Sequence, residues 1–155
     1  MFNLLIQHTM KNMRFFFLAL ALTLFSVSLS ARDEIISEQQ LPAAAKTFVK
    51  QYFKNRTVSL AKKDVDLGST SYDIVLNSGT KIEFNAKGEW KEVDCAPAAV
   101  PSALIPSAIA SYVKANYANC KIVKIERDRS GFDIELSNDV DLRFDKQGKF
   151  IRVDD

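Results

Sequence analysis

The chain has 155 residues, 47% hydrophobic and 26% charged, with 21 basic and 19 acidic side chains and a formal net charge of +2. Two of the basic residues, Lys11 and Arg14, lie in the first thirty residues, which contain no acidic residue, so the remainder carries 19 charges of each sign. This balance, without a cluster of lysine and arginine, excludes the usual electrostatic surfaces for nucleic acid and for anionic membranes.

Residues 1–30 predict a secretory signal peptide. Lys11 and Arg14 precede an apolar run over residues 15–25, about half the length needed to cross a bilayer. Ser28 and Ser30 then offer small side chains at the −3 and −1 positions of a cleavage site. No cysteine lies near this junction, so we expect a periplasmic protein without a lipid anchor or membrane contact after cleavage. An uncleaved N-terminal anchor is the alternative.

The remaining chain begins with a predicted amphipathic helix and four predicted strands. The apolar stripe of the helix recurs at helical spacing and comprises Leu41, Ala45, Phe48, Val49, Tyr52 and Phe53. Pro42 suits the first turn because its missing N–H has no helical partner there. Strands are expected near residues 57–67, 72–77, 80–85 and 89–93, separated by turn sequences such as Asn77-Ser78-Gly79.

A proline- and alanine-rich connector follows at residues 95–102, and a domain boundary is expected near residue 95. Cys95 and Cys120 are the two cysteines of the chain. A disulfide between them is expected in an oxidising compartment, where it would contribute about 3 kcal/mol of stability. Two unpaired buried thiols are the alternative, because sequence alone does not place the Cα atoms within reach.

Residues 105–155 repeat the first pattern. Leu41-Pro42 matches Ile105-Pro106, and later segments match at a constant offset, as in Tyr72-Asp73-Ile74-Val75-Leu76 with Phe132-Asp133-Ile134-Glu135-Leu136. Strands are expected near residues 121–129, 131–136, 139–145 and 148–153. The predicted organisation is a signal peptide at 1–30, a first αββββ repeat at 31–94 and a second αββββ repeat at 95–155.

Alternation along the strands separates an apolar face from a charged face. The apolar face is predicted to hold Tyr72, Ile74, Leu76, Ile82 and Phe84, and then Phe132, Ile134, Leu136, Val140, Leu142 and Phe144. The fold class is therefore α+β, with two tandem αββββ units in which one helix packs on one face of an antiparallel four-stranded sheet. The two units could also share one continuous sheet, and the sequence does not decide between these arrangements.

A Leu-Pro helix start, the strand Tyr72-Asp73-Ile74 and the segment from Gly79 through Trp90 to Val93 form a familiar pattern. Residues 41–155 resemble the PepSY-like family with a β-lactamase-inhibitor-like fold, found in exported proteins of Bacteroidetes. The second copy departs from this pattern at Phe150, which replaces Trp90, and at Asp139, which replaces Gly79. The resemblance implies an αββββ fold and a role in binding and inhibiting another secreted protein.

No catalytic or metal constellation is predicted outside the leader. The single histidine, His8, precedes the cleavage site, which removes histidine-dependent nucleophilic catalysis and histidine-ligated metals. Pairing Glu83 with Asp73 or Glu92 as hydrolytic carboxylates is disfavoured, because adjacent lysines would neutralise them. The residues Asp139, Asp141 and Asp145 do not match an EF-hand loop. We therefore expect no enzyme, no metal and no cofactor.

The leading functional hypothesis is an exported, non-enzymatic module that binds a periplasmic or secreted protein or peptide through the open sheet face and hairpin loops. The candidate binding residues are Asp73, Val75, Lys81, Glu83, Lys91 and Trp90. Trp90 has a second interpretation as a core residue under the helix, since Phe150 keeps the position aromatic. The alternative function is binding of a small ligand or a cell-envelope glycan.

Overall fold

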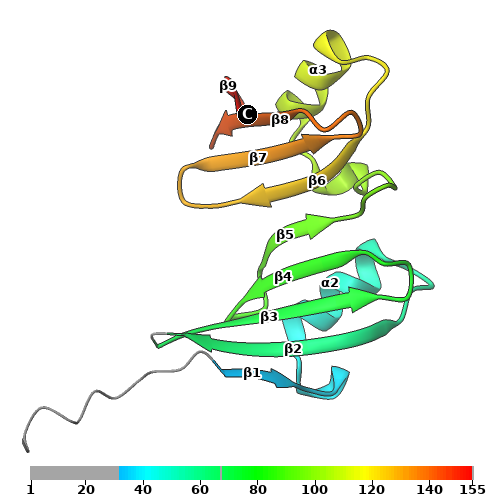
Figure 1. Cartoon of the computed structure of the whole chain (residues 1–155), viewed down its shortest axis with the longest axis vertical. Helices are drawn as coiled ribbons and strands as arrows, with labels where there is room; N and C mark the ends of the chain where they lie inside the picture. The colour runs from blue at the N-terminus through cyan, green and yellow to red at the C-terminus, as the bar shows by residue number, and fades with distance from the viewer. Residues whose placement is uncertain (1–31, 67, 155) are drawn as a thin grey trace, which may run out of the picture. The chain divides into compact units, whose positions relative to one another are not determined.

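The computed structural model describes residues 32–66 and 68–154 (Figure 1). The predicted signal peptide lies outside these ranges. The strands are β1 (Arg32–Ile35), β2 (Val58–Asp66), β3 (Ser69–Leu76), β4 (Lys81–Asn85), β5 (Trp90–Asp94), β6 (Ile122–Arg127), β7 (Gly131–Leu136), β8 (Asp141–Asp145) and β9 (Phe150–Asp154). The helices are α2 (Ala43–Tyr52) and α3 (Ser107–Asn116), with short 3-10 helices at Glu38–Gln40 and Ser102–Leu104. In the part of the chain that the structure describes, no helix is long and apolar enough to span a bilayer.

All nine described strands form one antiparallel sheet in which each strand pairs with its neighbours in sequence, from β1 to β9 (Figure 1). The predicted α+β class is confirmed. Two separate four-stranded sheets are not formed, because β5 pairs with β6 through Val93 and Ile125. A hydrogen bond from the Cys95 N–H to the Val123 carbonyl (2.8 Å) continues this junction. The strand β1 was not predicted, and it adds a ninth member beside β2.

The two helices begin and end in the same way. Pro42 and Pro106 occupy the N-cap positions, just before the first helical residue. At the C-terminal ends, Phe53 and Tyr117 leave helical geometry while their N–H groups still donate to the carbonyls of Val49 and Val113. The first proline-fixed turn and the apolar stripe together therefore set the length of both helices.

One hydrophobic core lies between the helices and one face of the sheet. The Phe48 ring of α2 meets Phe84 edge-on at 5.6 Å, and the Tyr112 ring of α3 meets Phe144 edge-on at 5.4 Å. The buried strand residues that were predicted from alternation are Ile74, Leu76, Ile82, Phe84, Ile134, Leu136, Leu142 and Phe144. Both helices thus cover the same face, and the other face, here called the open face, has no helix among the described residues.

Val93 and Val153 provide a matched test of this core. Val93 pairs with Ile82 and is fully buried, whereas Val153 pairs with Leu142 and is 45% exposed. We expect Val93→Ala to lower the free energy of unfolding by about 2 kcal/mol, since it removes buried methyl groups and leaves a cavity. Val153→Ala should cost less than about 0.5 kcal/mol. Urea unfolding followed by circular dichroism measures both, and equal losses would contradict the assigned burial.

Candidate functional site

A row of five carboxylates crosses the open face from β3 to β7. Asp73 pairs in register with Glu83, and Glu83 pairs with Glu92. Across the β5–β6 junction Glu92 pairs with Glu126, which in turn pairs with Asp133. Directly opposed residues in an antiparallel sheet lie about 5 Å apart, and like charges at that spacing repel. This carboxylate row is therefore the most concentrated charge feature of the described sheet.

Three members of the carboxylate row have a cationic partner. Lys91 Nζ donates to Glu83 Oε1, and Lys124 Nζ lies 3.1 Å from Glu92 Oε2. Arg143 donates to Asp133 Oδ2. Among the described residues, the other two members, Asp73 and Glu126, form no ion pair within 4.0 Å. The row therefore keeps unpaired negative charge at two separate points.

The surroundings of these two carboxylates disfavour their ionised forms. Partial burial raises the pKa of Asp73, and the neighbouring charges of Glu83 and Asp64 raise it further. Partial burial likewise raises the pKa of Glu126, with added repulsion from Glu92 and Asp133. A nearby cationic group would relieve the repulsion in both cases. Lys62, which pairs in register with Asp73, and Lys124 beside Glu126 oppose these shifts without cancelling them. Both carboxylates therefore remain incompletely compensated.

Glu126→Gln is expected to stabilise the fold at neutral pH. Because the pKa of Glu126 is higher in the folded state, the folded protein binds the proton more tightly than the unfolded chain. The ionised side chain therefore costs stability above the folded pKa, and this cost disappears as the pH falls below the unfolded value of about 4.3. The gain should be about 0.5 kcal/mol at pH 7 and should vanish near pH 4.

Urea unfolding at the two pH values measures this gain. The control is Glu34→Gln on β1, where the side chain is exposed and pairs in register with Lys63. The control should not stabilise the fold at either pH. A destabilising effect of Glu126→Gln at pH 7 would show that Glu126 is favourably paired.

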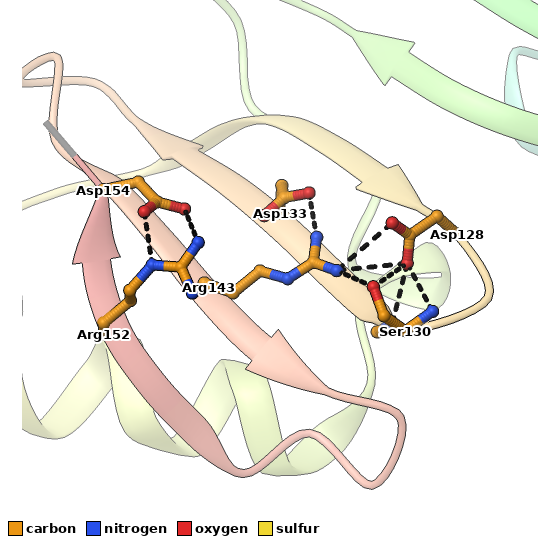
Figure 2. A network of polar contacts seen from close by, with 7 residues as sticks. Asp128, Ser130, Asp133, Arg143, Arg152 and Asp154 are labelled. Atoms are coloured by element: carbon orange, nitrogen blue, oxygen red, sulfur yellow. Dashed lines mark hydrogen bonds and ion pairs between the residues drawn. The ribbon is translucent and has the colours of Figure 1, made fainter.

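Arg143 ends the carboxylate row and anchors it to the β6–β7 turn (Figure 2). Its side chain is 11% exposed and contacts Asp128, Asp133 and Ser130. Asp128 Oδ1 also accepts from the Ser130 N–H (2.6 Å) and the Gly131 N–H (2.9 Å). A hydrogen bond from the Ser130 hydroxyl (2.8 Å), together with these two N–H bonds and with help from Arg143, holds the pKa of Asp128 well below its ordinary value. Arg143 therefore has a structural role and is not free to bind a ligand.

The structure brings most of the predicted binding residues together. Asp73, Val75, Lys81 and Glu83 line one shallow hollow on the open face, and Lys91 contacts its edge through Glu83. Lys81 does not neutralise the row as predicted, because its ammonium group lies 3.6 Å from Asp94. These placements leave the predicted binding role itself untested.

Trp90 does not belong to this surface. Its ring centroid lies 6.3 Å from that of Phe48 on α2, and the Arg127 guanidinium carbon lies 4.1 Å above the ring. Arg127 Nε also donates to the Trp90 carbonyl at 2.7 Å. Trp90 thus packs on the helix side of the sheet, as its second interpretation required.

The open face has a second hollow that was not predicted from the sequence. Its lining residues are Lys124, Glu126, Asp133, Ile134, Glu135, Asp141 and Asp154. The outward direction of Glu126 and Asp133 follows from alternation, but their position beside Glu92 depends on the β5–β6 pairing. A search for acidic residues at alternate positions in consecutive strands would have found the row only if the continuous sheet had been assumed.

Cys95 and Cys120 are unpaired in the structure. Cys95 is buried in the core, and Cys120 is partly buried against it. Burial raises the pKa of the Cys95 thiol, although a hydrogen bond with Thr80 opposes this effect. The arrangement corresponds to the second alternative, two separate thiols, and not to the expected disulfide.

Alkylation should distinguish the two thiols. The thiolate is the reacting form, so the buried, high-pKa Cys95 should react with iodoacetamide much more slowly than Cys120 in the native protein. A time course read by peptide mass spectrometry measures both rates. In concentrated urea, used as the control, the two rates should converge. Protection of both cysteines until a reductant is added would instead demonstrate a disulfide.

Comparison with known proteins identifies the fold family. The family model described as "Putative beta-lactamase-inhibitor-like, PepSY-like" matches residues 70–152. The chain belongs to the PepSY-like family. This match covers strands β3 to β8 and most of β9, including every member of the carboxylate row. No curated protein is significantly similar to the chain.

Solved structures of proteins from Bacteroides are similar to this chain. One from Bacteroides thetaiotaomicron, described as a "putative calcium-regulated periplasmic protein", is 42% identical, with a TM-score of 0.76 over 79% of this chain and 97% of that chain. A Bacteroides vulgatus "putative periplasmic protein of unknown function" is also 42% identical, with a TM-score of 0.78 over 80% of this chain and all of that chain. The family and the α+β fold are thus shown, and the relatives are described as periplasmic.

Proposed function

We propose that this PepSY-like chain is an exported, non-enzymatic binding module that holds a basic segment of another periplasmic protein on its open face. The observation that carries the proposal is the carboxylate row, in which Asp73 and Glu126 have no cationic partner within ion-pair distance among the described residues. Lysine and arginine side chains of a partner would supply those charges. The predicted leader at residues 1–30 and the description of relatives as periplasmic support export, and the lack of a cysteine near the predicted cleavage site supports export without a lipid anchor.

A protein or peptide partner fits this surface better than a glycan. Sugar-binding surfaces need exposed aromatic rings for stacking, and every aromatic residue in the described ranges belongs to the core or packs against it. The hollow around Val75 and Leu60 supplies a small apolar area beside the charges. That combination suits an extended segment with alternating basic and apolar side chains.

The residues do not fit a calcium site as they stand, despite the description of one relative. Within residues 32–66 and 68–154, no three acidic, cysteine or histidine side chains are grouped closely enough to hold a metal ion. Calcium prefers six to eight oxygen ligands, whereas the row alternates with Lys91, Lys124 and Arg143. The description of the Bacteroides thetaiotaomicron protein is therefore not carried over to this chain.

We also infer that residues 31–94 and 95–155 are two copies of one unit. Each contains a helix that begins after a proline, and each has a bulge at the same point, between Glu83 and Phe84 and between Arg143 and Phe144. On the open face the equivalent residues differ in charge, as with Glu83 and Arg143. The binding surface therefore belongs to the joined sheet and not to one copy.

Affinity capture tests the proposed function. The protein would be immobilised and exposed to an envelope extract, alongside a variant with Asp73→Asn, Glu92→Gln and Glu126→Gln. A control variant would carry Glu38→Gln, Asp66→Asn and Asp139→Asn, which remove three exposed carboxylates away from the row. We expect the wild type and the control to retain the same basic protein and the row variant to lose it.

A synthetic peptide gives a second, partner-independent measurement. An alternating Lys-Val peptide should bind the wild type, with an affinity that falls as salt is added, and should bind the row variant at least tenfold more weakly. An alternating Glu-Val peptide serves as the control ligand. Equal capture and equal peptide binding by the wild type and the row variant would rule out the carboxylate row as the binding surface.

A further inference from the structure

The strand β9 is an edge strand whose apolar side is uncovered. Among the described strands it pairs with β8 alone. Register partners form a continuous apolar row on the helix side of the sheet: Ala61, Ile74, Ile82, Val93, Ile125, Ile134, Leu142 and Val153. The first seven are at most 3% exposed, but Val153 is 45% exposed and Ile151 is 49% exposed. The core therefore ends abruptly at β9.

The chain itself shows how such an edge is covered. At β5, the residues Glu92, Val93 and Asp94 pair with β6, and Val93 belongs to the core and is completely buried. On β9, Arg152, Val153 and Asp154 occupy the corresponding positions relative to the preceding strand. The same three-residue edge is thus covered in one place and open in the other.

The charges of β9 are mismatched with the strand beside it. Asp154 pairs in register with Asp141, and Arg152 pairs with Arg143. Because like charges in register repel, neither residue gains an opposite charge from β8. Instead Arg152 turns along its own strand, where its Nε donates to Asp154 Oδ1 at 2.6 Å and its Nη2 to Oδ2 at 3.1 Å (Figure 2). Any further partner for these two charges would have to come from the free side of β9.

We propose that β9 pairs with β9 of a second copy of this chain. In an antiparallel pairing centred on Val153, Arg152 lies opposite Asp154 of the second copy, and Asp154 lies opposite its Arg152. Val153 then lies opposite Val153 of the second copy on the helix side, where both become covered. The order Arg-Val-Asp is complementary to itself in this direction, so the contact is two-fold symmetric and closes as a dimer.

The size of the contact sets its strength. Three register positions per copy bury little surface compared with stable interfaces, and no loop tethers the two copies as it tethers β5 to β6. The dimer therefore forms in a concentration-dependent equilibrium with the monomer. Its helices lie on one side, so the two open faces lie together on the other.

Charge reversal and mixing test this pairing directly. Protein produced from the full-length sequence would be studied by sedimentation velocity over a range of concentrations, as wild type, Arg152→Asp and Asp154→Arg. Each single variant places like charges opposite each other and should remain monomeric. In an equal mixture, one copy is acidic at both positions and the other is basic at both, so every opposed pair is attractive and association should return. The control is Lys54→Glu, at an exposed position just after α2 and away from both β9 and the carboxylate row, which should dimerise like the wild type.

Two results would overturn the proposal: a wild type that stays monomeric at the highest concentration, or single variants that dimerise as well as the wild type. Failure of the mixed variants to associate, with native circular dichroism for each, would overturn it as well. The carboxylate row is intact in all these variants, so peptide binding by the open face is measured independently of the dimer.

Discussion

Gly131→Ala is expected to lower the free energy of unfolding by at least about 3 kcal/mol. Gly131 has φ +155°, and it pairs in register with Asp145 on β8. A methyl group there would overlap the Phe144 carbonyl oxygen and lie 2.9 Å from the Asp145 Cα. These are backbone atoms of the neighbouring strand, so no side-chain rotation relieves the overlap. Either β7 and β8 separate locally or the β6–β7 turn is lost.

The matched control for this substitution is Ser71→Ala. Ser71 pairs in register with Asn85, which is the corresponding position of β3 and β4, and it already carries a Cβ. Ser71→Ala should change the free energy of unfolding by less than about 0.5 kcal/mol. Urea unfolding of both variants provides the comparison. A loss below about 1 kcal/mol for Gly131→Ala would mean that β7 and β8 approach less closely than described.

Phe84→Ala should cost about 4 kcal/mol of stability, in the range found for buried phenylalanine truncations. Phe84 is completely buried and meets the Phe48 ring edge-on. Phe144 is equally buried, and its ring centroid lies 5.4 Å from that of Tyr112 and 5.8 Å from that of Phe150. The Phe144→Ala variant should therefore show a loss of similar size. Thermal and urea unfolding measure both.

The two phenylalanine variants also report on the cooperativity of the sheet. The β5–β6 pairing joins the two parts of the core, so each variant should show a single unfolding transition by circular dichroism and by Trp90 fluorescence. Phe84→Leu and Phe144→Leu serve as conservative controls with smaller losses. Two separated transitions in either alanine variant would show that the core divides at the junction.

The helices and the strand faces were predictable from local patterns. The apolar residues from Leu41 to Phe53 recur at helical spacing, and only a helix places them on one buried side. The alternation through Ile74, Ile82 and Phe84 likewise buries these side chains only in a strand of one register. The turns around Gly79 and Gly88 limited where the strands could end, because both residues have positive φ. Asp139 adopts the same conformation with φ 61°, so a missing glycine did not mean a missing turn.

The joining of the strands across the connector was harder to predict. Pairing of β5 with β6 brings Val93 beside Ile125, far along the chain, and no local pattern determines such a contact. The strand β1 was missed because Asp33 and Glu34 are exposed at an edge and show no apolar alternation. The candidate site has the same limitation: Asp73 and Glu83 were named, but Glu126 and Asp133 joined them only through the junction.

The order of the sheet has a consequence for how the protein is made. Every strand pairs with its immediate neighbours in sequence, so each segment completes its main-chain bonds as soon as the next strand is available. Such neighbour-only topologies have low contact order and fold faster than sheets with distant pairings. A chain delivered N-terminus first can add strands one after another, from β1 onward, to a sheet that already exists. Incomplete chains would then expose a single growing edge, which shortens the time in which an unpaired strand is open to aggregation.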